Sequence, residues 1–437
     1  MKGKIYIFLA CVYMIFLIVS NDVRAEDFWQ APFDTSASEI QSADSTLSLR
    51  EVLNLVASEN SRFKALDYQL QAARGEIRQA GLWSNPELEM EFEEVSWDAP
   101  GFRESEISVA LAQEFEFFGQ RGARKGVAEA QLEATELQVR LTSFDLYLIT
   151  KQRFYTLAHA QQEVHLFRDA VELAEEIVNN IEYRLDKGAA LQSELILAQL
   201  NLERTNLALE EAMRDMEALE AELVSLWKSR LSGIRVLSEA EPDFKSLANK
   251  LDLLLNRSDS SRQVLQIKNE LKIIGAEKAK VIAEARPTVT FSAGIKRLEA
   301  DNSNSLVLGL SLPIPLFNRN QGIRESLDAQ QRSLDYDIAQ DEIEAFSRIR
   351  SHTIRLKKLI DKHAALDSEL LPRAEAAYRT LQDNYEAGRV PYTQLLEAER
   401  TLNDFNFEHN DILLAIQEQI IVLEGLTGVV MITEKEN

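Results

Sequence analysis

The chain has 437 residues, of which 71 are acidic and 48 are Lys or Arg, and its formal net charge is −23. This acidic excess disfavours nucleic-acid binding, which requires a basic surface to meet the phosphates. The only cysteine, Cys11, lies in the apolar N-terminal segment. The mature chain is therefore expected to have no disulfide, no thiolate metal site and no thiol chemistry.

Residues 1–25 are typical of a secretory signal peptide. Two lysines precede an apolar segment at 5–19, and Val-Arg-Ala at 23–25 is a small-x-small cleavage site. A signal anchor is an alternative, but the apolar segment is shorter than the roughly 20 residues that cross a bilayer. A lipidated Cys11 is a second alternative, although the apolar segment continues beyond it. Residues 26–46 are polar and aperiodic and are predicted to form an extended arm.

The mature chain contains an internal repeat with an offset of about 200 residues, which indicates a duplicated architecture. The pairs that share this offset are Gly122 and Gly322, Arg124 and Arg324, Gly188 and Gly388, Leu195 and Leu395, Ala198 and Ala398, and Leu202 and Leu402. The repeats are predicted at 47–229 and 244–428, with an equatorial linker at 230–243 and a C-terminal tail at 429–437.

Each repeat is predicted to contain a helix, a β-hairpin, a very long helix and a return helix, in that order. In the first repeat the leading helix spans about 48–80, the hairpin 86–117, the long helix 119–187 and the return helix 190–229. In the second, these elements span about 244–285, 287–314, 319–387 and 391–426. Pro372 lies inside the second long helix and is expected to kink or break it.

Both hairpins alternate apolar with polar or small residues, as a β-strand between lipid and water does. In the first hairpin Leu88, Met90 and Phe92 alternate with acidic residues. The carboxylates assigned to the polar, lumen-facing side are Glu89, Glu91, Glu93, Glu114 and Glu116. The alternative interpretation is that any aqueous lumen must be polar and that the acidic composition of these strands is incidental.

Four strands are too few to close a membrane barrel, because the smallest known barrels have about eight. Open strand edges are not tolerated in lipid hydrocarbon. The chain is therefore predicted to form a homotrimer in contact with outer-membrane lipid, with a shared barrel of about twelve strands.

The long and return helices carry apolar residues that step alternately by four and three, which is typical of a coiled-coil seam. In the first return helix this series runs from Leu191 through Leu195 and Ala198 to Leu226. Glycine turns at Gly188 and Gly388 are predicted to reverse the chain between the paired helices. A soluble coiled-coil rod is the alternative that the helices alone leave open.

With its duplicated hairpin-and-helix layout, the chain resembles the outer-membrane efflux protein (TolC) family over nearly all of its mature length. The proline before each hairpin and the segments Leu195-Ile-Leu-Ala198 and Leu395-Leu-Glu-Ala398 after the glycine turns also match. The strand-to-helix junction at 115–124, Phe-Glu-Phe-Phe-Gly-Gln-Arg-Gly-Ala-Arg, resembles the CzcC-like heavy-metal branch, except that Gln120 replaces a common lysine.

The resemblance implies a mainly α-helical fold with membrane β-hairpins: a trimeric twelve-stranded outer-membrane β-barrel, four strands per chain, continued by a periplasmic α-helical barrel. It also implies a passive duct for metal or other cations. The implied partners are a periplasmic adaptor protein and an inner-membrane pump of the RND type.

Residues near the two glycine turns are candidate sites that the resemblance implies. Positions six and nine residues after each glycine correspond to a pore constriction, and the candidates there are Glu194, Gln394 and Glu397. The alternative interpretation is that the two glutamates lie on ordinary solvated helix faces. The implied adaptor-docking residues are Leu185, Gly188, Ala189, Leu191, Gly388, Arg389 and Val390.

No enzyme motif, cofactor site or metal site is predicted. The five histidines show no i, i+4 pair, and His363 and His409 fall on helix seams, where a hydrogen-bonded core histidine is expected. Alternatives for the function are a multidrug or type I secretion duct and, from a different class, a soluble periplasmic scaffold or adaptor.

Overall fold

The computed structural model describes residues 46–94, 105–227, 233–237, 253–299 and 301–431, together with Phe244, Leu247 and Leu251. The predicted signal peptide, the predicted arm except Thr46, and the predicted linker except residues 233–237 lie outside the described residues. So do the loop of the first hairpin and residues 432–437 of the predicted tail.

The chain divides into two compact units. Unit 1 comprises residues 1–64, 140–262 and 342–437, and unit 2 comprises residues 65–139 and 263–341. The two long helices α4 (Gln120–Asp186) and α8 (Gln321–Ala365) contribute residues to both.

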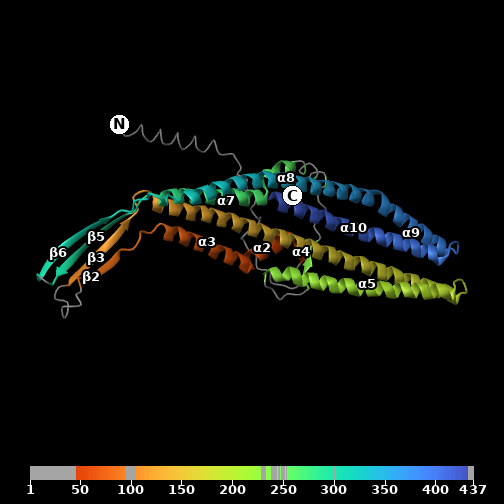
Figure 1. The fold of residues 1–437 in the computed structure, drawn as a ribbon. Helices are drawn as coiled ribbons and strands as arrows, with labels where there is room; N and C mark the ends of the chain where they lie inside the picture. Colours follow the sequence, from red (N-terminus) through yellow and green to blue (C-terminus); the bar gives the residue numbers. More distant parts are fainter. Residues whose placement is uncertain are drawn as a thin grey trace, which may run out of the picture. The chain divides into compact units, whose positions relative to one another are not determined.

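Unit 2 contains a four-stranded antiparallel sheet in the order β2-β3-β5-β6 (Figure 1). The strands are β2 (Glu87–Glu93), β3 (Glu106–Phe115), β5 (Val289–Leu298) and β6 (Ser303–Ser311). Each strand belongs to a predicted hairpin, and β3 pairs with β5, so the two hairpins join in one sheet.

The strand register confirms the predicted division into an apolar and a polar face. Leu88 pairs with Leu111, Met90 with Val109 and Glu91 with Ser108, and paired residues share a face. Further residues on the apolar face include Phe115, Phe291, Ala293, Ile295, Leu306, Leu308 and Leu310. The alternation in the sequence is therefore preserved across all four strands.

Unit 1 is built mainly from two pairs of antiparallel helices. Alongside α4 runs α5 (Gln192–Val224), and alongside α9 (Leu371–Glu386) runs α10 (Tyr392–Thr427) (Figure 1). In α5 the predicted seam is buried or half-buried from Leu195 to Leu226, whereas Leu191 at the turn is exposed. The four-three spacing thus identified the packed face of the helix.

Three predicted helices are interrupted. The leading helix of the first repeat is split at Asn60 into α2 (Leu49–Glu59) and α3 (Ser61–Ala80). The helix expected at 244–285 is interrupted by a 3₁₀ turn, η3 (Leu255–Ser260). The described residues Phe244, Leu247, Leu251, Leu253 and Leu254 before this turn are helical, and α7 (Arg262–Glu284) follows it. A π-helical turn, η4 (Leu366–Leu370), separates α8 from α9. It ends two residues before Pro372, whose missing amide hydrogen and ring disfavour continuous α-helical bonding.

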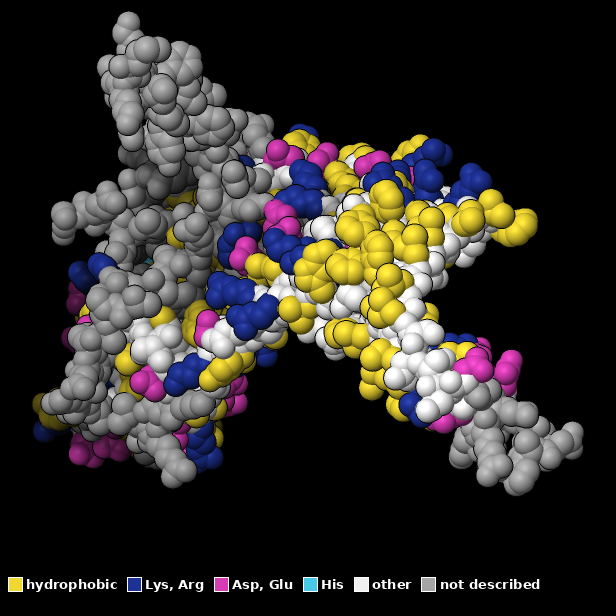
Figure 2. Space-filling view, turned by 90° about the vertical axis from the view of Figure 1, so that its left-hand side faces the viewer, with side chains coloured by type: hydrophobic (Ala, Val, Ile, Leu, Met, Phe, Trp, Pro, Cys, Tyr) yellow, Lys and Arg dark blue, Asp and Glu magenta, His cyan; other side chains and the backbone are white. Residues whose placement is uncertain are grey.

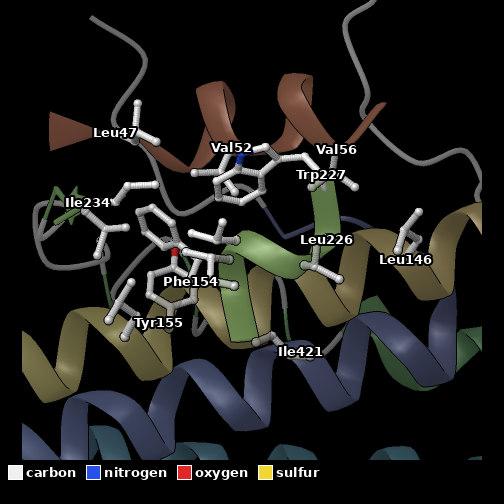
Figure 3. Close-up of a cluster of buried hydrophobic side chains, with 14 residues drawn as sticks. Leu47, Val52, Val56, Leu146, Phe154, Tyr155, Leu226, Trp227, Ile234 and Ile421 are labelled. Atoms are coloured by element: carbon white, nitrogen blue, oxygen red, sulfur yellow. The ribbon is translucent and has the colours of Figure 1, made fainter. Parts of the chain in front are cut away.

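One hydrophobic cluster of unit 1 joins the leading helix to the helix pair of the first repeat (Figure 3). Val52 and Val56 of α2 are fully buried, and they pack in the same cluster as Phe154 of α4 and Trp227 of the 3₁₀ turn η2 (Ser225–Trp227). Ser48 begins α2 with a capping box, in which its hydroxyl accepts from Glu51 N–H and the Glu51 carboxylate accepts from Ser48 N–H.

A two-residue parallel pairing between β1 (Thr46–Leu47) and β4 (Arg235–Val236) covers the same core. This pairing ties the start of the first repeat to residues within the predicted linker. None of the helices in the described part of the chain has both the length and the apolar character needed to cross a membrane.

Candidate functional sites: the helical tips and the two faces of the sheet

The two glycine turns have the same backbone geometry. Gly188 and Gly388 adopt φ values of 72° and 69°, a left-handed conformation that glycine reaches without a Cβ clash. Gly188 N–H donates to Leu185 O at 2.9 Å and Ala189 N–H donates to Arg184 O at 2.8 Å. The second turn repeats both bonds from Gly388 to Tyr385 O and from Arg389 to Asn384 O, at 2.9 and 2.8 Å. Each turn therefore closes its helix with a Schellman motif.

A single arginine connects the two turns. Arg184 Nη1 donates to the backbone oxygen of Tyr385, and its Nη2 donates to Ala189 O at 3.3 Å. The guanidinium also lies 4.3 Å from the centroid of the Tyr385 ring, within cation–π range. In the second repeat the position equivalent to Arg184 is Asn384, so the second long helix has no matching arginine to contact the first turn.

Five of the seven predicted docking residues are exposed: Gly188, Ala189, Leu191, Gly388 and Arg389. The other two, Leu185 and Val390, are half-buried and pack against a tip core that includes Ile181, Tyr392 and Leu395. Sequence reasoning missed Tyr183, Ile196 and Leu200, which are 66%, 49% and 62% exposed near the first turn. These apolar residues do not fall on the four-three spacing of the helix seam. That mismatch is the feature of the sequence that could have identified them.

The three predicted pore residues differ in environment. Gln394 and Glu397 are exposed, and both line a shallow depression between α9 and α10 with Ala377 and Leu381. Glu194 is half-buried, and its carboxylate accepts a hydrogen bond from Leu191 N–H at 3.4 Å at the start of α5. Glu194 therefore caps a helix, and a pore role for these three residues stays a prediction.

A buried carboxyl group near the second tip was not found by sequence reasoning. Glu399 is only 2% exposed, and its carboxyl group accepts a hydrogen bond from Asn201 Nδ2 at 3.4 Å. Burial raises the pKa of Glu399 to about 7. Its second oxygen and the hydroxyls of Tyr378 and Tyr392 have no hydrogen-bond partner among the described residues. Burial also raises the pKa of Tyr378 to about 12, so this hydroxyl stays neutral.

The polar face of the sheet is strongly acidic. By register it carries Glu87, Glu89, Glu91, Glu93, Glu106 and Glu114. The only basic side chain that these four strands place on this face is Lys296, which forms ion pairs with Glu106 and, at 2.8 Å, with Glu93. The arrangement leaves four carboxylates of each chain without a cation on this face.

Glu116 differs from the other predicted lumen carboxylates. It lies beyond the end of β3, its side chain is only 8% exposed, and it forms an ion pair with Arg124 of α4. The second guanidinium nitrogen of Arg124 binds the other carboxylate oxygen at 3.1 Å. Glu116 thus joins the strand to the following helix instead of adding an unpaired charge to the polar face.

The opposite face of the sheet is apolar and uncovered. Leu306 and Leu308 are each 73% exposed, and Leu88 and Leu310 are each 67% exposed. Figure 2 shows hydrophobic side chains gathered over the sheet side of the molecule. An apolar surface of this extent on a folded protein indicates contact with lipid or with another protein.

Comparison with known proteins gives the family to which the chain belongs. The family model described as outer membrane efflux protein matches twice, at residues 52–227 and 254–429, once in each half. The chain is an outer membrane efflux protein.

Two relatives of this chain have names that refer to metals. The cobalt-zinc-cadmium resistance protein CzcC of Cupriavidus metallidurans is 25% identical over 92% of this chain and 96% of the relative. The nickel-cobalt-cadmium resistance protein NccC of Alcaligenes xylosoxydans is 27% identical over 68% of this chain and 64% of that protein. Among solved structures, CusC aligns with a TM-score of 0.73 at 18% identity, over 91% of this chain and 97% of that one.

The TolC-like fold class and the outer-membrane location, with extension into the periplasm, are thereby confirmed. The alternative of a soluble periplasmic scaffold is wrong for this efflux protein, because the family model covers both helical repeats and both hairpins. The uncovered apolar face of the sheet has the character that a lipid-facing surface requires.

Proposed function

We propose that this efflux protein is the passive trimeric duct of a tripartite RND-type system, and that it exports heavy-metal or other cations from the periplasm or the pump. The helical tips would dock on a periplasmic adaptor protein, and the inner-membrane pump would supply energy and direction. Family membership and the metal-resistance names of CzcC and NccC support this proposal.

The observation that carries the cation preference is the charge on the polar face of the sheet. Six carboxylates and one lysine share that face in each chain. In a trimeric barrel with this face inward, the lumen would be negative on every side. A low-dielectric wall focuses such a field, raising the local concentration of cations and lowering that of anions.

The test is growth of a deletion strain on a panel of divalent metal salts and common drugs. Wild-type protein should restore metal tolerance. The triple variant Glu89→Gln, Glu91→Gln, Glu114→Gln should restore it only in part, because it removes three lumen charges per chain. A matched control replaces the exposed residues Glu203, Glu211 and Glu217 of α5 with glutamine and should behave like wild type.

Sensitivity of the deletion strain to drugs alone would contradict the cation preference and favour the multidrug alternative. Full metal tolerance in the lumen triple variant, at equal outer-membrane abundance, would contradict a role for the sheet carboxylates. Planar-bilayer reversal potentials in a salt gradient would give the same comparison without a pump, because the lumen triple variant should be less cation-selective.

A further inference from the structure

The junctions between strands and helices in unit 2 form a basic zone in an otherwise acidic chain. No acidic residue occurs at 117–128, at 285–298 or at 302–324, although the chain has a net charge of −23. These three segments contain the starts of α4 and α8 and the end of the turn that follows α7. They also contain Arg121, Arg286 and Arg319.

An unbroken chain of aromatic contacts runs from the lipid-facing side of the sheet to one of these arginines. The Phe291 ring lies edge-on to Phe115, with centroids 5.7 Å apart, and both belong to the apolar face. Phe115 contacts Trp83 edge-on at 6.1 Å, and the Arg121 guanidinium lies 5.0 Å from the Trp83 ring centroid. Arg121 is therefore on the lipid side of the junction.

Exposed apolar side chains flank the arginines in both halves of the repeat. In the first half Trp83 and Phe117 are 50% and 60% exposed, and in the second half Ile314 and Phe317 are 72% and 90% exposed. Aromatic residues at the boundary between strand and solvent are typical of the headgroup level of a membrane. Because the helices extend into the periplasm, this boundary is the periplasmic one.

The three arginines bind backbone oxygens and leave donors free. Arg121 donates to Gly81 O, Arg286 donates to Phe118 O at 3.1 Å, and Arg319 donates to Pro315 O at 3.2 Å. Within the described part of the chain, no carboxylate forms an ion pair with any of them. These bonds hold each guanidinium in place, while the remaining N–H donors suit the oxygens of a phosphate group.

We propose that Arg121, Arg286 and Arg319 form a binding surface for the phosphates of anionic glycerophospholipids in the periplasmic leaflet of the outer membrane. The charge complementarity is direct, since the zone lacks the acidic residues that cover other parts of the protein. The aromatic side chains fix the depth of the protein in the bilayer, and the arginines select negatively charged headgroups just below them.

Native mass spectrometry of the purified full-length protein tests the proposal. The protein in a non-ionic detergent is titrated with phosphatidylglycerol or with phosphatidylcholine of the same acyl chains. Wild type should bind phosphatidylglycerol more tightly. The triple variant R121Q/R286Q/R319Q should lose this preference, by about fivefold for each arginine at low ionic strength.

A control with the same change in charge, R204Q/R350Q/R355Q, alters exposed helical arginines elsewhere and should keep the wild-type preference. Should the triple variant not assemble, Arg319→Gln alone gives the same readout, because Arg319 is exposed and its contact is with a backbone oxygen. An unchanged phosphatidylglycerol preference in the assembled variants would overturn the proposal, as would an equal loss in the control. Displacement of the lipid by inorganic phosphate at equal concentration would also overturn it, by indicating a site for the free anion.

Discussion

Helix α10 carries two buried carboxyl groups whose surroundings differ sharply. Glu424, near its C-terminal end, is fully buried, and it binds Lys151 Nζ at 2.8 and 3.0 Å and Met431 N–H at 2.7 Å. Glu399, near the helical tip, is equally inaccessible, but among the described residues it has only the amide of Asn201 and the more distant charge of Arg400.

The difference shows how one helix stabilises a charge at one end and favours a neutral acid at the other. Burial raises the pKa of Glu424, while Lys151, the Met431 amide and the Tyr147 hydroxyl all act to lower it. At Glu399 burial is opposed only weakly. Because an unpaired buried charge is costly, the C-terminal end of α10 holds an ion pair, whereas its N-terminal part, near the tip, holds a group that titrates near neutral pH.

The largest expected effect comes from breaking the buried pair of Lys151 and Glu424. Lys151→Met leaves Glu424 buried without its counter-charge and should destabilise the protein by about 3–5 kcal/mol. Thermal unfolding followed by circular dichroism checks this. Adding Glu424→Gln should recover part of the loss, because the orphaned charge is then removed.

Lys125→Met serves as the matched control for this variant. Lys125 pairs with Glu129 on an exposed helix surface, with both side chains about half exposed. Removing an exposed pair should change stability by less than about 1 kcal/mol. Equal losses of stability in the Lys151→Met and Lys125→Met variants would show that the buried pair contributes no more than an exposed one.

The second largest effect is a pH dependence of stability that comes from Glu399 near the helical tip. The pKa of Glu399 rises from 4.5 to about 7, so the folded protein retains a proton that the unfolded chain releases. Stability should therefore fall as pH rises from about 4.5 to about 7, by up to about 3 kcal/mol, and then stay constant. Glu399→Gln should remove most of this slope, which unfolding at several pH values would measure.

Glu397→Gln is the control for the pH effect, since Glu397 is exposed two residues away and should leave the slope unchanged. A pH dependence that is the same in wild type and in the Glu399→Gln variant would contradict the comparison. The wild-type slope would then belong to other carboxylates.

The smallest effect tests the link between the two turns. Arg184→Ala removes the bonds to Tyr385 O and Ala189 O and the stacking on the Tyr385 ring, and should weaken the tips locally by about 1–2 kcal/mol. Hydrogen exchange should become faster in both turns. Arg389→Ala, whose side chain is exposed and bonds only to Asn384 at 3.4 Å, should change exchange little.

Much of the fold was predictable from local patterns. The alternation around Met90 and Val109 identified the faces of the sheet, the four-three spacing from Leu195 identified the packed side of α5, and Gly188 and Gly388 marked the turns. The breaks at Asn60 and at η3 were not predicted, because hydrophobic periodicity continues through a short interruption.

The candidate sites were less predictable, since several depend on contacts between distant residues. Glu399 follows Ala398, and nothing in the sequence distinguishes it from the exposed glutamates of the same helix. In the structure, packing with Asn201 and Tyr378 buries it. Arg121 likewise carries no signal by itself. Its position on the lipid side follows from Trp83 and Phe115, which lie on other elements.

The sequence by itself determined the features that repeat along the chain: strand alternation, helix seams, glycine turns and the duplication. Each depends on the geometry of a single element, in which side-chain direction follows residue number. The tertiary structure decided the pairing of β3 with β5, the ion pair of Lys151 with Glu424 across 273 positions, and the isolation of Glu399. Burial and pairing of charges depend on which elements meet, and no local pattern encodes that.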